Sequence, residues 1–439
     1  MYSERSVSVF AALHYHRRRL GARLHRLRLA LHARGWRGVL ARISGGEPAA
    51  PGDSGCAPHL GPPVSGGSGV GEGRRVLLVD VSTPRPDRDS GSLRACNLMR
   101  LLMGEGFQVD FLPDDGADAG PYTQALLDLG VQVRHGAATK ARRRWFKTHG
   151  DSYDAIVISR YHLAEYLIPL LRKYAPRATL VLDTVDLHHL REEREAGLRK
   201  DPALRRLAAS TRKRELAAIA SADVAWVVSP AEAELLARAL PSASVEVLPN
   251  LHEVEHSPAP FQARSGLLFV GGARHPPNVD AAGWLLTRIW PLVRARLPGC
   301  TLHIVGEGMP AALAGTGDPE SAVLHGHLPD LAPLLGRARV GLAPLRFGAG
   351  VKGKINLCMA SGMPVVATGC AAEGMHLEHG RDILVADTAE EFADAVVTLH
   401  SDPAQWSSLS EAGLDNVRRH FSFDAARATI AATFPPPAS

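Results

Sequence analysis

Long hydrophobic segments and cysteines are both scarce in this sequence of 439 residues. No run of 18 successive apolar residues occurs, which excludes a helix that spans a membrane. The five cysteines are scattered and lack the spacing of metal ligands. They argue against a disulfide framework or a zinc site and suit a reducing cytoplasm. With 45% hydrophobic and 22% charged residues, the chain has an ordinary soluble composition, and its length predicts two domains plus extensions.

Acidic residues are nearly absent from the start of the chain. Residues 1–43 contain ten arginines, no lysine and one acid, Glu4, so their net charge is +9. The whole chain carries +5, which leaves −4 for residues 44–439. The basicity therefore belongs to one tail, and the mildly acidic main body argues against nucleic-acid binding.

Residues 7–43 are predicted to form a basic amphipathic helix. Leucines recur three, four or seven positions apart among arginines, a pattern typical of a helix on an anionic membrane surface. A solvated extension, or a helix that docks on another subunit, is the alternative. Arginines interrupt any apolar core, so the segment is not a secretory signal. Residues 44–73, rich in Gly, Pro, Ser and Ala, are predicted to be a flexible linker. The helix pattern comprises Leu13, Leu20, Leu24, Leu27 and Leu31, with Trp36 near its end.

A first alternation of apolar strands and helical segments covers residues 74–250. This alternation predicts a parallel, doubly wound sheet, whose ligands bind beyond the carboxyl ends of the strands. Polar candidates at those ends are Ser90, Gly91 and Ser92, then Arg160, Asp186 and His188. Strands are expected over 75–80, 107–112, 131–134, 155–159, 179–183, 224–228 and 245–248, with a helix over 93–104.

A second alternation covers residues 251–439, after a segment (249–265) that is predicted to be a hinge. Two such domains would enclose a deep cleft between them, and the last helix could cross back to the first domain. Strands are expected over 267–271, 301–306, 323–325, 339–344, 364–368 and 383–386. Helices are expected over 278–296, 331–336, 352–362, 389–400, 403–420 and 423–432.

The loop Phe347–Lys354 (FGAGVKGK) lies between an expected strand and an expected helix. Its glycines let backbone N–H groups approach an anion, the helix start adds partial positive charge, and Lys352 and Lys354 add full charges. This pattern predicts a diphosphate cradle, although the spacing is not that of a P-loop. The alternative is a glycine-rich turn with two solvated lysines. A dehydrogenase is disfavoured because the loop after Asp80 lacks G-x-G-x-x-G.

Several stretches in the chain resemble motifs of the group 1 family of glycosyltransferases, known as family 4. They are FVGGARHPPNVD (269–280), APLRFGAGVKGKI (343–355) and GMPVVAT (362–368), with TPRPDRDSGS (83–92) and VDLH (185–188) in the first domain. The resemblance extends over roughly residues 74–432, and the motifs occur in the expected order.

This resemblance implies the GT-B fold, in which two Rossmann-like doubly wound α/β domains face each other across a cleft. It implies a nucleotide-sugar donor in the second domain and a glycan or lipid-linked acceptor held mainly by the first. Members typically retain the anomeric configuration and need no bound metal or other cofactor. A role in bacterial surface polysaccharide synthesis follows, in the cytoplasm or at the inner face of the membrane.

The resemblance also assigns catalytic roles. Arg274 and Lys354 would stabilise the charge that grows on the leaving diphosphate, and one such donor can be worth about 3–4 kcal/mol. His188 would bind the donor sugar, with His189 as the competing choice. The donor-binding residues would be Gly272, Asn278, Gly348, Gly350, Lys352, Thr368 and Glu373. The acceptor-binding residues would be Ser90, Gly91, Ser92, Arg160 and Asp186.

The sequence departs from the family pattern at two positions. Ala349 and Leu357 stand where the best-known members have glutamates, one of which would hold the ribose hydroxyls. Glu373 is the expected substitute, although it could equally cap a following helix. Two other functions remain open for this chain, a nucleotide-sugar 2-epimerase on the same fold and a non-catalytic binding scaffold.

Overall fold

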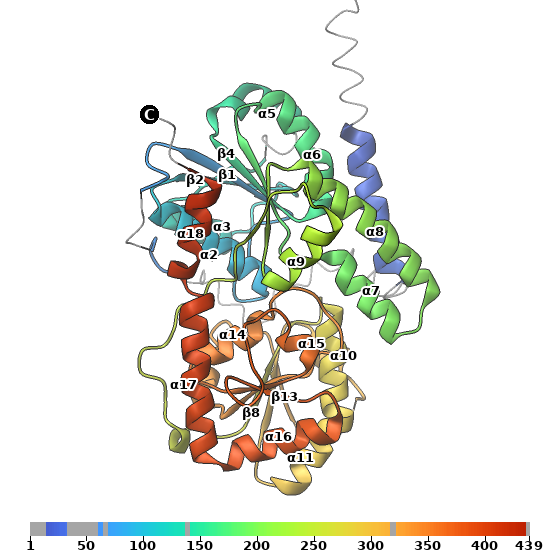
Figure 1. Cartoon of the computed structure of the whole chain (residues 1–439), viewed down its shortest axis with the longest axis vertical. Helices are drawn as coiled ribbons and strands as arrows, with labels where there is room; N and C mark the ends of the chain where they lie inside the picture. Colours follow the sequence, from blue (N-terminus) through green and yellow to red (C-terminus); the bar gives the residue numbers. More distant parts are fainter. Residues whose placement is uncertain (1–14, 33–59, 65–68, 137–140, 317–321, 436–439) are drawn as a thin grey trace, which may run out of the picture.

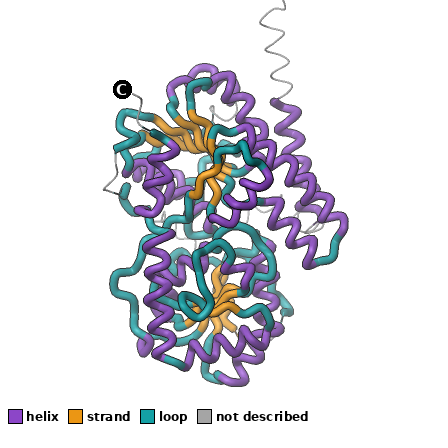
Figure 2. The backbone as a smooth tube through the Cα atoms, viewed as in Figure 1, coloured by secondary structure: helices purple, strands orange, loops and turns teal. Residues whose placement is uncertain are grey.

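The computed structural model describes residues 15–32, 60–64, 69–136, 141–316 and 322–435. Two α/β domains lie one above the other along the long axis of the molecule (Figure 1). In each domain, helices cover a central sheet on both sides (Figure 2). The prediction of two doubly wound domains is confirmed.

The first sheet has the strand order β3-β2-β1-β4-β5-β6-β7, with every pairing parallel. Its central strands are almost wholly buried, as expected for apolar strands between two layers of helices. The strand order reverses between β1 and β4: earlier strands are added on one side of β1 and later strands on the other. Folds of this kind bind ligands at that position. The strands are β1 (Arg75–Asp80), β2 (Gln108–Pro113), β3 (Gln132–Val133), β4 (Ala155–Ser159), β5 (Thr179–Asp183), β6 (Val224–Val227) and β7 (Val245–Val247).

Helices connect these strands and form the two outer layers of the first domain. The longest, α8, packs against both α7 and α6. The helices are α2 (Ser90–Gly104), α3 (Pro121–Leu129), α5 (Arg142–His149), α6 (Tyr161–Tyr174), α7 (His188–Leu198), α8 (Pro202–Ser221) and α9 (Pro230–Ala239), with a 3-10 turn at Gly150–Ser152.

The second sheet has the strand order β10-β9-β8-β11-β12-β13, again with every pairing parallel. This order reverses between β8 and β11. Its strands are β8 (Leu267–Val270), β9 (Leu302–Val305), β10 (Ala322–Gly326), β11 (Val340–Ala343), β12 (Val365–Ala367) and β13 (Leu384–Val385). Its helices are α10 (Pro276–Trp284), α11 (Trp290–Arg296), α12 (Met309–Ala312), α13 (Ala332–Arg337), α14 (Gly353–Ala360), α15 (Gly369–Ala372), α16 (Ala389–Ser401) and α17 (Pro403–His420), with a 3-10 turn at Phe261–Ala263.

One expected helix is interrupted. The continuous helix predicted over 278–296 is divided into α10 and α11 by a π-helical turn, Leu285–Ile289. Pro291 has no backbone N–H, so the carbonyl of Thr287 receives no helical donor from it, and a π turn accommodates such a mismatch.

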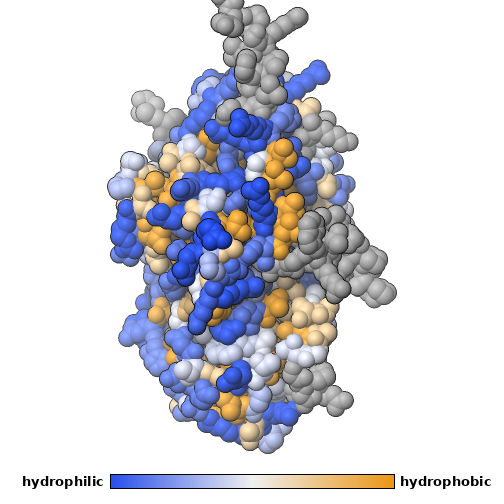
Figure 3. Space-filling model, turned by 90° about the vertical axis from the view of Figure 1, so that its right-hand side faces the viewer, coloured by the Kyte–Doolittle hydropathy of each residue, from blue (hydrophilic) through white to orange (hydrophobic). Residues whose placement is uncertain are grey.

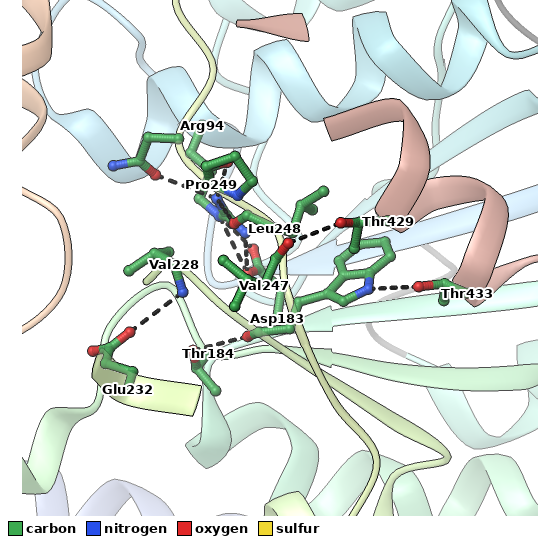
Figure 4. Close-up of polar contacts among 12 residues, drawn as sticks. Arg94, Asp183, Thr184, Val228, Glu232, Val247, Leu248, Pro249, Thr429 and Thr433 are labelled. Atoms are coloured by element: carbon green, nitrogen blue, oxygen red, sulfur yellow. Dashed lines mark hydrogen bonds and ion pairs between the residues drawn. The ribbon is translucent and has the colours of Figure 1, made fainter. Parts of the chain in front are cut away.

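The last helix, α18 (Phe423–Thr433), crosses back to the first domain. Ile430 and Phe434 are fully buried in the first domain's core. The Trp226 indole N–H donates to Thr433 Oγ1 at 3.0 Å, and Thr429 Oγ1 donates to the Val247 carbonyl at 2.9 Å (Figure 4). The predicted crossing is therefore present, and it ties the chain's end to its first sheet.

The start of the predicted hinge is anchored to the first domain. The buried Arg94 guanidinium donates to the carbonyls of Leu248 and Pro249 at 2.9 and 2.8 Å and forms an ion pair with Asp183 at 2.8 Å (Figure 4). Beyond these residues the chain enters the second domain, and it returns between α17 and α18.

The prediction of a flexible linker over 44–73 is wrong for its described parts, 60–64 and 69–73. Leu60, Val64 and Val70 pack against the first domain's core, because these few apolar side chains find a buried place beside α2. Arg100 Nε donates to the Pro62 carbonyl at 2.9 Å. The rest of the linker lies outside the described residues.

The basic segment is helical over residues 15–32, as predicted, and Leu13 and Trp36 of the predicted pattern lie outside the described residues. This N-terminal helix runs beside α8 (Figure 1). In the described part of the chain, no helix has the length and apolar character needed to cross a membrane.

Candidate active site

The glycine loop lies directly against the first domain. Gly350 has a φ of 67°, in the left-handed region that favours glycine, and a Cβ there would lie 3.0 Å from the Cβ of Asp186. A Cβ at Gly353 would lie 2.9 Å from the Cβ of Ser90. The loop follows β11 and opens α14, so the carboxyl end of the second sheet meets that of the first.

Two lysines of this loop are partly removed from solvent. Lys354 Nζ donates to Asn278 Oδ1 at 2.6 Å and lies 4.6 Å from the centre of the Phe269 ring. Lys352 Nζ turns back onto its own loop and donates to the Gly350 carbonyl at 2.5 Å. Burial, reinforced by the charge of Lys352, lowers the pKa of Lys354 to about 7, and burial also lowers the pKa of Lys352. No described carboxylate forms an ion pair with either lysine, so an anionic ligand would supply the missing charge.

Asn278, at the start of α10, fixes Lys354 in place. Its amide Nδ2 donates to the Gly272 carbonyl at 3.1 Å while its Oδ1 accepts from Lys354. A Cβ at Gly271 would lie 2.6 Å from the Asn278 Cγ, so glycine is needed for this packing. A Cβ at Gly272 would meet only ordinary contacts, 3.7 Å from the Arg88 carbonyl oxygen.

Arg274 lies where the two domains are in contact. Its Nη2 lies 3.3 Å from Glu307 Oε1, and the same carboxylate oxygen lies 2.8 Å from Nη1 of Arg88 in the first domain. The Arg274 side chain is 69% exposed. A second contact between the domains joins His327 Nε2 to Asp87 Oδ2 at 2.8 Å. Two guanidinium groups, one from each domain, thus contact the same carboxylate.

Thr368 and Glu373 are both engaged within the structure. Thr368 Oγ1 donates to the Leu345 carbonyl at 2.5 Å and accepts from the Ala371 N–H at 3.2 Å, as the N-cap of α15. Glu373 ends α15, so the alternative that it caps a following helix is wrong. Its carboxylate instead accepts from both terminal nitrogens of Arg194, at 2.7 and 2.8 Å. Although burial opposes the change, Arg194 lowers the pKa of Glu373.

His188 and His189 are clearly distinguished by their surroundings. His189 Nδ1 lies 2.6 Å from Oε2 of the fully buried Glu215, which also accepts from the backbone N–H groups of both histidines. The His188 ring instead lies beside the Tyr161 and His162 rings, with Nε2 3.2 Å from Asp186 Oδ1. Burial lowers the pKa of His188 well below 6.5, so the ring is neutral at pH 7. His189 is therefore held by a buried carboxylate, whereas His188 lies beside Asp186, one of the acceptor candidates.

The acceptor candidates gather at the carboxyl ends of β1, β4 and β5. Arg160 and Val185, just past β4 and β5, have φ values of 74° and 66°. Such conformations are unfavourable for side chains other than glycine, above all for a β-branched one, and strain of this kind clusters at functional sites. Asp186 follows Val185 and forms an ion pair with Arg191.

The turn that opens α2 contacts the same region. A Cβ at Gly91 would lie 3.0 Å from Arg160 Nη2, and Arg160 Nε lies 3.1 Å from Asp80 Oδ1. Ser92 Oγ donates to the N-cap residue Asp89 at 2.8 Å. Ser90, Gly91, Ser92, Arg160 and Asp186 are thus brought together from three separate strands.

Three residues of this region were missed by the sequence reasoning. Glu307 follows β9 and could have been found by the rule that ligands bind at the carboxyl ends of strands. Arg88 and Arg194 lie in a loop and on α7, and their contacts with the second domain depend on tertiary structure alone. Among the described residues, no group of three or more His, Cys, Asp or Glu could hold a metal ion.

Comparisons with known proteins agree with this fold. Solved structures of similar fold include a sucrose-phosphate synthase from Thermosynechococcus elongatus, at 16% identity and a TM-score of 0.63, covering 82% of this chain and 98% of that one. HepE of Anabaena, solved with UDP-glucose, has 15% identity and a TM-score of 0.61, and the match covers 82% of this chain and 98% of that one. A glycosyltransferase from Rickettsia africae has 10% identity and a TM-score of 0.56, and the match covers 82% of this chain and 97% of that one. No curated protein matches the sequence.

The fold defined by these likenesses is GT-B, the two-domain fold of many glycosyltransferases. Residues 264–402, which include the glycine loop, Arg274 and Lys354, match the family described as Glycosyl transferases group 1. The second half of the chain thus contains a domain of the Glycosyl transferases group 1 type.

Proposed function

We propose that this protein transfers a sugar from a nucleoside-diphosphate sugar to a glycan or lipid-linked acceptor, with retention of configuration, in bacterial surface polysaccharide synthesis. The observation that carries the proposal is that Lys352 and Lys354 lie partly buried in one loop and that no described carboxylate forms an ion pair with either. They lie in a glycine loop at a helix start, directly opposite Asp186. Such an arrangement suits a diphosphate, whose charge the backbone N–H groups and the two ammonium groups would share.

The donor would lie along the second domain. Its diphosphate would contact the loop at Gly348 and Gly350, with Lys354 on one side and Arg274 on the other. Asn278 would keep Lys354 aimed at the phosphates. Because HepE was solved with UDP-glucose and shares this fold, its structure supports a nucleotide sugar as donor.

The reaction breaks the bond between the anomeric carbon and the diphosphate oxygen. Negative charge grows on that oxygen, and Arg274 and Lys354 would stabilise it in place of a metal ion. The acceptor hydroxyl would attack from the same face, and its proton would pass to the departing diphosphate. Neutral His188, beside Asp186, would hydrogen-bond a hydroxyl of the donor sugar and hold the anomeric carbon toward the acceptor.

The ribose contact would differ from the family pattern. Ala349 and Leu357 have no carboxylate, and we propose Glu373 for this role. Since Glu373 pairs with Arg194 of the first domain, donor binding would exchange that ion pair for a hydroxyl contact. The ribose would thereby compete with a contact that joins the two domains.

The experiment is release of nucleoside diphosphate from a panel of UDP-, GDP-, ADP- and dTDP-sugars, measured with and without extracted lipid-linked acceptor and after treatment with EDTA. The expected result is release with one donor, dependent on acceptor and unaffected by EDTA. NMR of the product should show the anomeric configuration of the donor. Conversion of the sugar without acceptor would favour an epimerase, and absence of nucleotide binding at millimolar concentration would favour a scaffold.

Variants test the assigned site. Lys354→Met and Arg274→Met should each lower kcat/KM by about 100-fold or more, as for loss of one transition-state donor. Arg288→Met, which removes an exposed cation of the second domain that has no assigned role, is the matched control and should behave as the unmodified protein. Equal activity in all three variants would contradict the assignment.

A further inference from the structure

The N-terminal helix, residues 15–32, is attached to the first domain through one face. Tyr15, Ala22 and His25 are buried on that face, and the Tyr15 ring packs edge-on against Tyr166 of α6. His25 Nε2 lies 2.8 Å from Thr211 Oγ1 of α8. At the helix end, His32 Nε2 lies 2.7 Å from Asp201 Oδ2. These contacts along its length fix which side of the helix faces outward.

The opposite face carries three exposed leucines. Leu20, Leu24 and Leu27 are 58%, 46% and 39% exposed. At about 100° per helical residue they fall within an arc of about 60°, centred opposite Ala22. Seven large hydrophobic residues are exposed in the described part of the chain, and three of them lie in this one short stretch. Exposed leucines that are scattered singly over a surface would not cluster on one helix face in this way.

Cations flank this leucine face. Arg17 and Arg28 are exposed on one side of it and Arg23 on the other. The surface that includes this helix shows a hydrophobic strip beside strongly hydrophilic residues (Figure 3). Apolar side chains between cations on a helix are the arrangement that binds in the headgroup region of an anionic bilayer.

We propose that the leucine face, Leu20, Leu24 and Leu27, enters the surface of an anionic lipid bilayer, while Arg17, Arg23 and Arg28 contact the lipid phosphates. The opposite face stays attached to the first domain, so the whole enzyme is held at the membrane in one orientation. This inference goes beyond the proposed function and does not depend on it, because bilayer binding requires no donor or acceptor.

Charge favours a bilayer over a second copy of the chain. If two copies packed symmetrically through the leucines, the arginines of one helix would lie near those of the other, which is repulsive. Anionic lipids instead neutralise every one of them.

The same helix reaches toward the site. The charge of Arg26 contributes, after burial, to lowering the pKa of both His162 and His188. His162 is buried, and neither of its ring nitrogens has a partner among the described residues. Since Arg19 Nη2 also lies 3.6 Å from Asp114 Oδ2, just past β2, the helix borders the carboxyl edge of the first sheet, where a lipid-linked substrate would arrive from the bilayer.

The test is co-sedimentation of the full chain with vesicles of phosphatidylcholine alone or mixed in equal parts with phosphatidylglycerol. The protein should bind the mixed vesicles and not the neutral ones. L20Q/L24Q/L27Q, which keeps good helix formers, should bind the mixed vesicles at least about tenfold more weakly. R17Q/R23Q/R28Q should lose the preference for phosphatidylglycerol. The control L127Q/L292Q removes two similarly exposed leucines elsewhere and should bind as the unmodified protein.

Several results would overturn the proposal. These are absence of binding to the mixed vesicles, equal binding by the leucine variant, or a dimer in light scattering that the leucine variant converts to monomer. Thermal melts establish that each variant is folded. If the leucine variant unfolds, the arginine variant decides the outcome, because its three side chains are exposed and its fold should persist.

Discussion

Arg194 of α7 and Glu373 at the end of α15 join the two domains by two hydrogen bonds, 2.7 and 2.8 Å long. Arg194 also donates to the carbonyl of Gly348, in the glycine loop, at 2.8 Å. One arginine of the first domain thus holds both the loop proposed for the diphosphate and the carboxylate proposed for the ribose. The state of the donor site and the contact between the domains are therefore linked through a single side chain.

This link predicts different effects of Arg194→Ala and Glu373→Ala. Arg194→Ala should free Glu373 for the ribose, so donor affinity should rise or stay constant while kcat falls as closure weakens. Glu373→Ala should lower donor affinity severalfold. Both side chains are partly exposed, so their coupling in unfolding free energy should be below about 1 kcal/mol. A double-mutant cycle on donor affinity and on stability measures both quantities. Identical losses of donor affinity in the two single variants would contradict the ribose role of Glu373.

Donor binding should be accompanied by proton uptake. Burial and the Lys352 charge lower the pKa of Lys354 to about 7, and a bound diphosphate should raise it again. Between about pH 7 and pH 9 the free lysine is largely neutral and the bound lysine charged, so a proton is taken up and affinity falls as pH rises. Calorimetry of nucleoside-diphosphate binding in buffers of different ionisation enthalpy measures this. Lys354→Arg should abolish the uptake, and uptake that persists in that variant would assign the proton elsewhere.

The two adjacent histidines should separate function from stability. His189→Ala removes a partner of the buried Glu215 and should lower the unfolding free energy by about 1–3 kcal/mol. His188→Ala loses packing against Tyr161 but leaves no buried carboxylate without its partner, so it should lower the melting temperature less than His189→Ala while lowering kcat by about 10- to 100-fold. Denaturant titration and steady-state kinetics of the two variants check this. The reverse pattern would exchange their roles.

The last helix should stabilise the first domain, although it follows the second in sequence. Ile430 is fully buried in the first domain's core, so Ile430→Ala should destabilise that domain by about 2–5 kcal/mol. Hydrogen exchange should show faster opening of β6 and β7 and little change in β12. Ala428→Ser, at an exposed position of the same helix, is the control. Faster exchange confined to the second sheet would contradict the packing described.

The sheets were predictable because their strands are short, continuous apolar segments between glycine, proline and polar residues. Val76–Val79 and Ile156–Ile158 are apolar at every position, which predicts strands of a sheet that helices cover on both sides. The π turn before Pro291 was not predicted, although the proline was visible. The buried contacts of Leu60, Val64 and Val70 were missed because the prediction used the average composition of the segment. Three apolar side chains are enough to attach an otherwise polar segment to the domain.

The candidate site was predictable where it depends on local sequence and not where it depends on distant pairs. Gly350, Lys354 and Asn278 belong to local motifs, and the structure brings them together. The partners of Glu373 and Arg274 are far away in the chain, and nothing near Arg194 or Arg88 in sequence indicates an interdomain contact. His188 and His189 could not be separated by sequence, because the distinction depends on Glu215, which lies on another helix.

The measurement that most directly tests the account is calorimetric titration with UDP, GDP, ADP and dTDP, and with the corresponding nucleosides, of the unmodified protein and of Lys354→Met. We predict that one diphosphate binds the unmodified protein, that Lys354→Met weakens it by about 100-fold, and that the weak binding of the matching nucleoside is unchanged. Undiminished binding of the diphosphate to Lys354→Met, or equal weakening of the nucleoside, would contradict the claim that the second domain's cations hold the diphosphate.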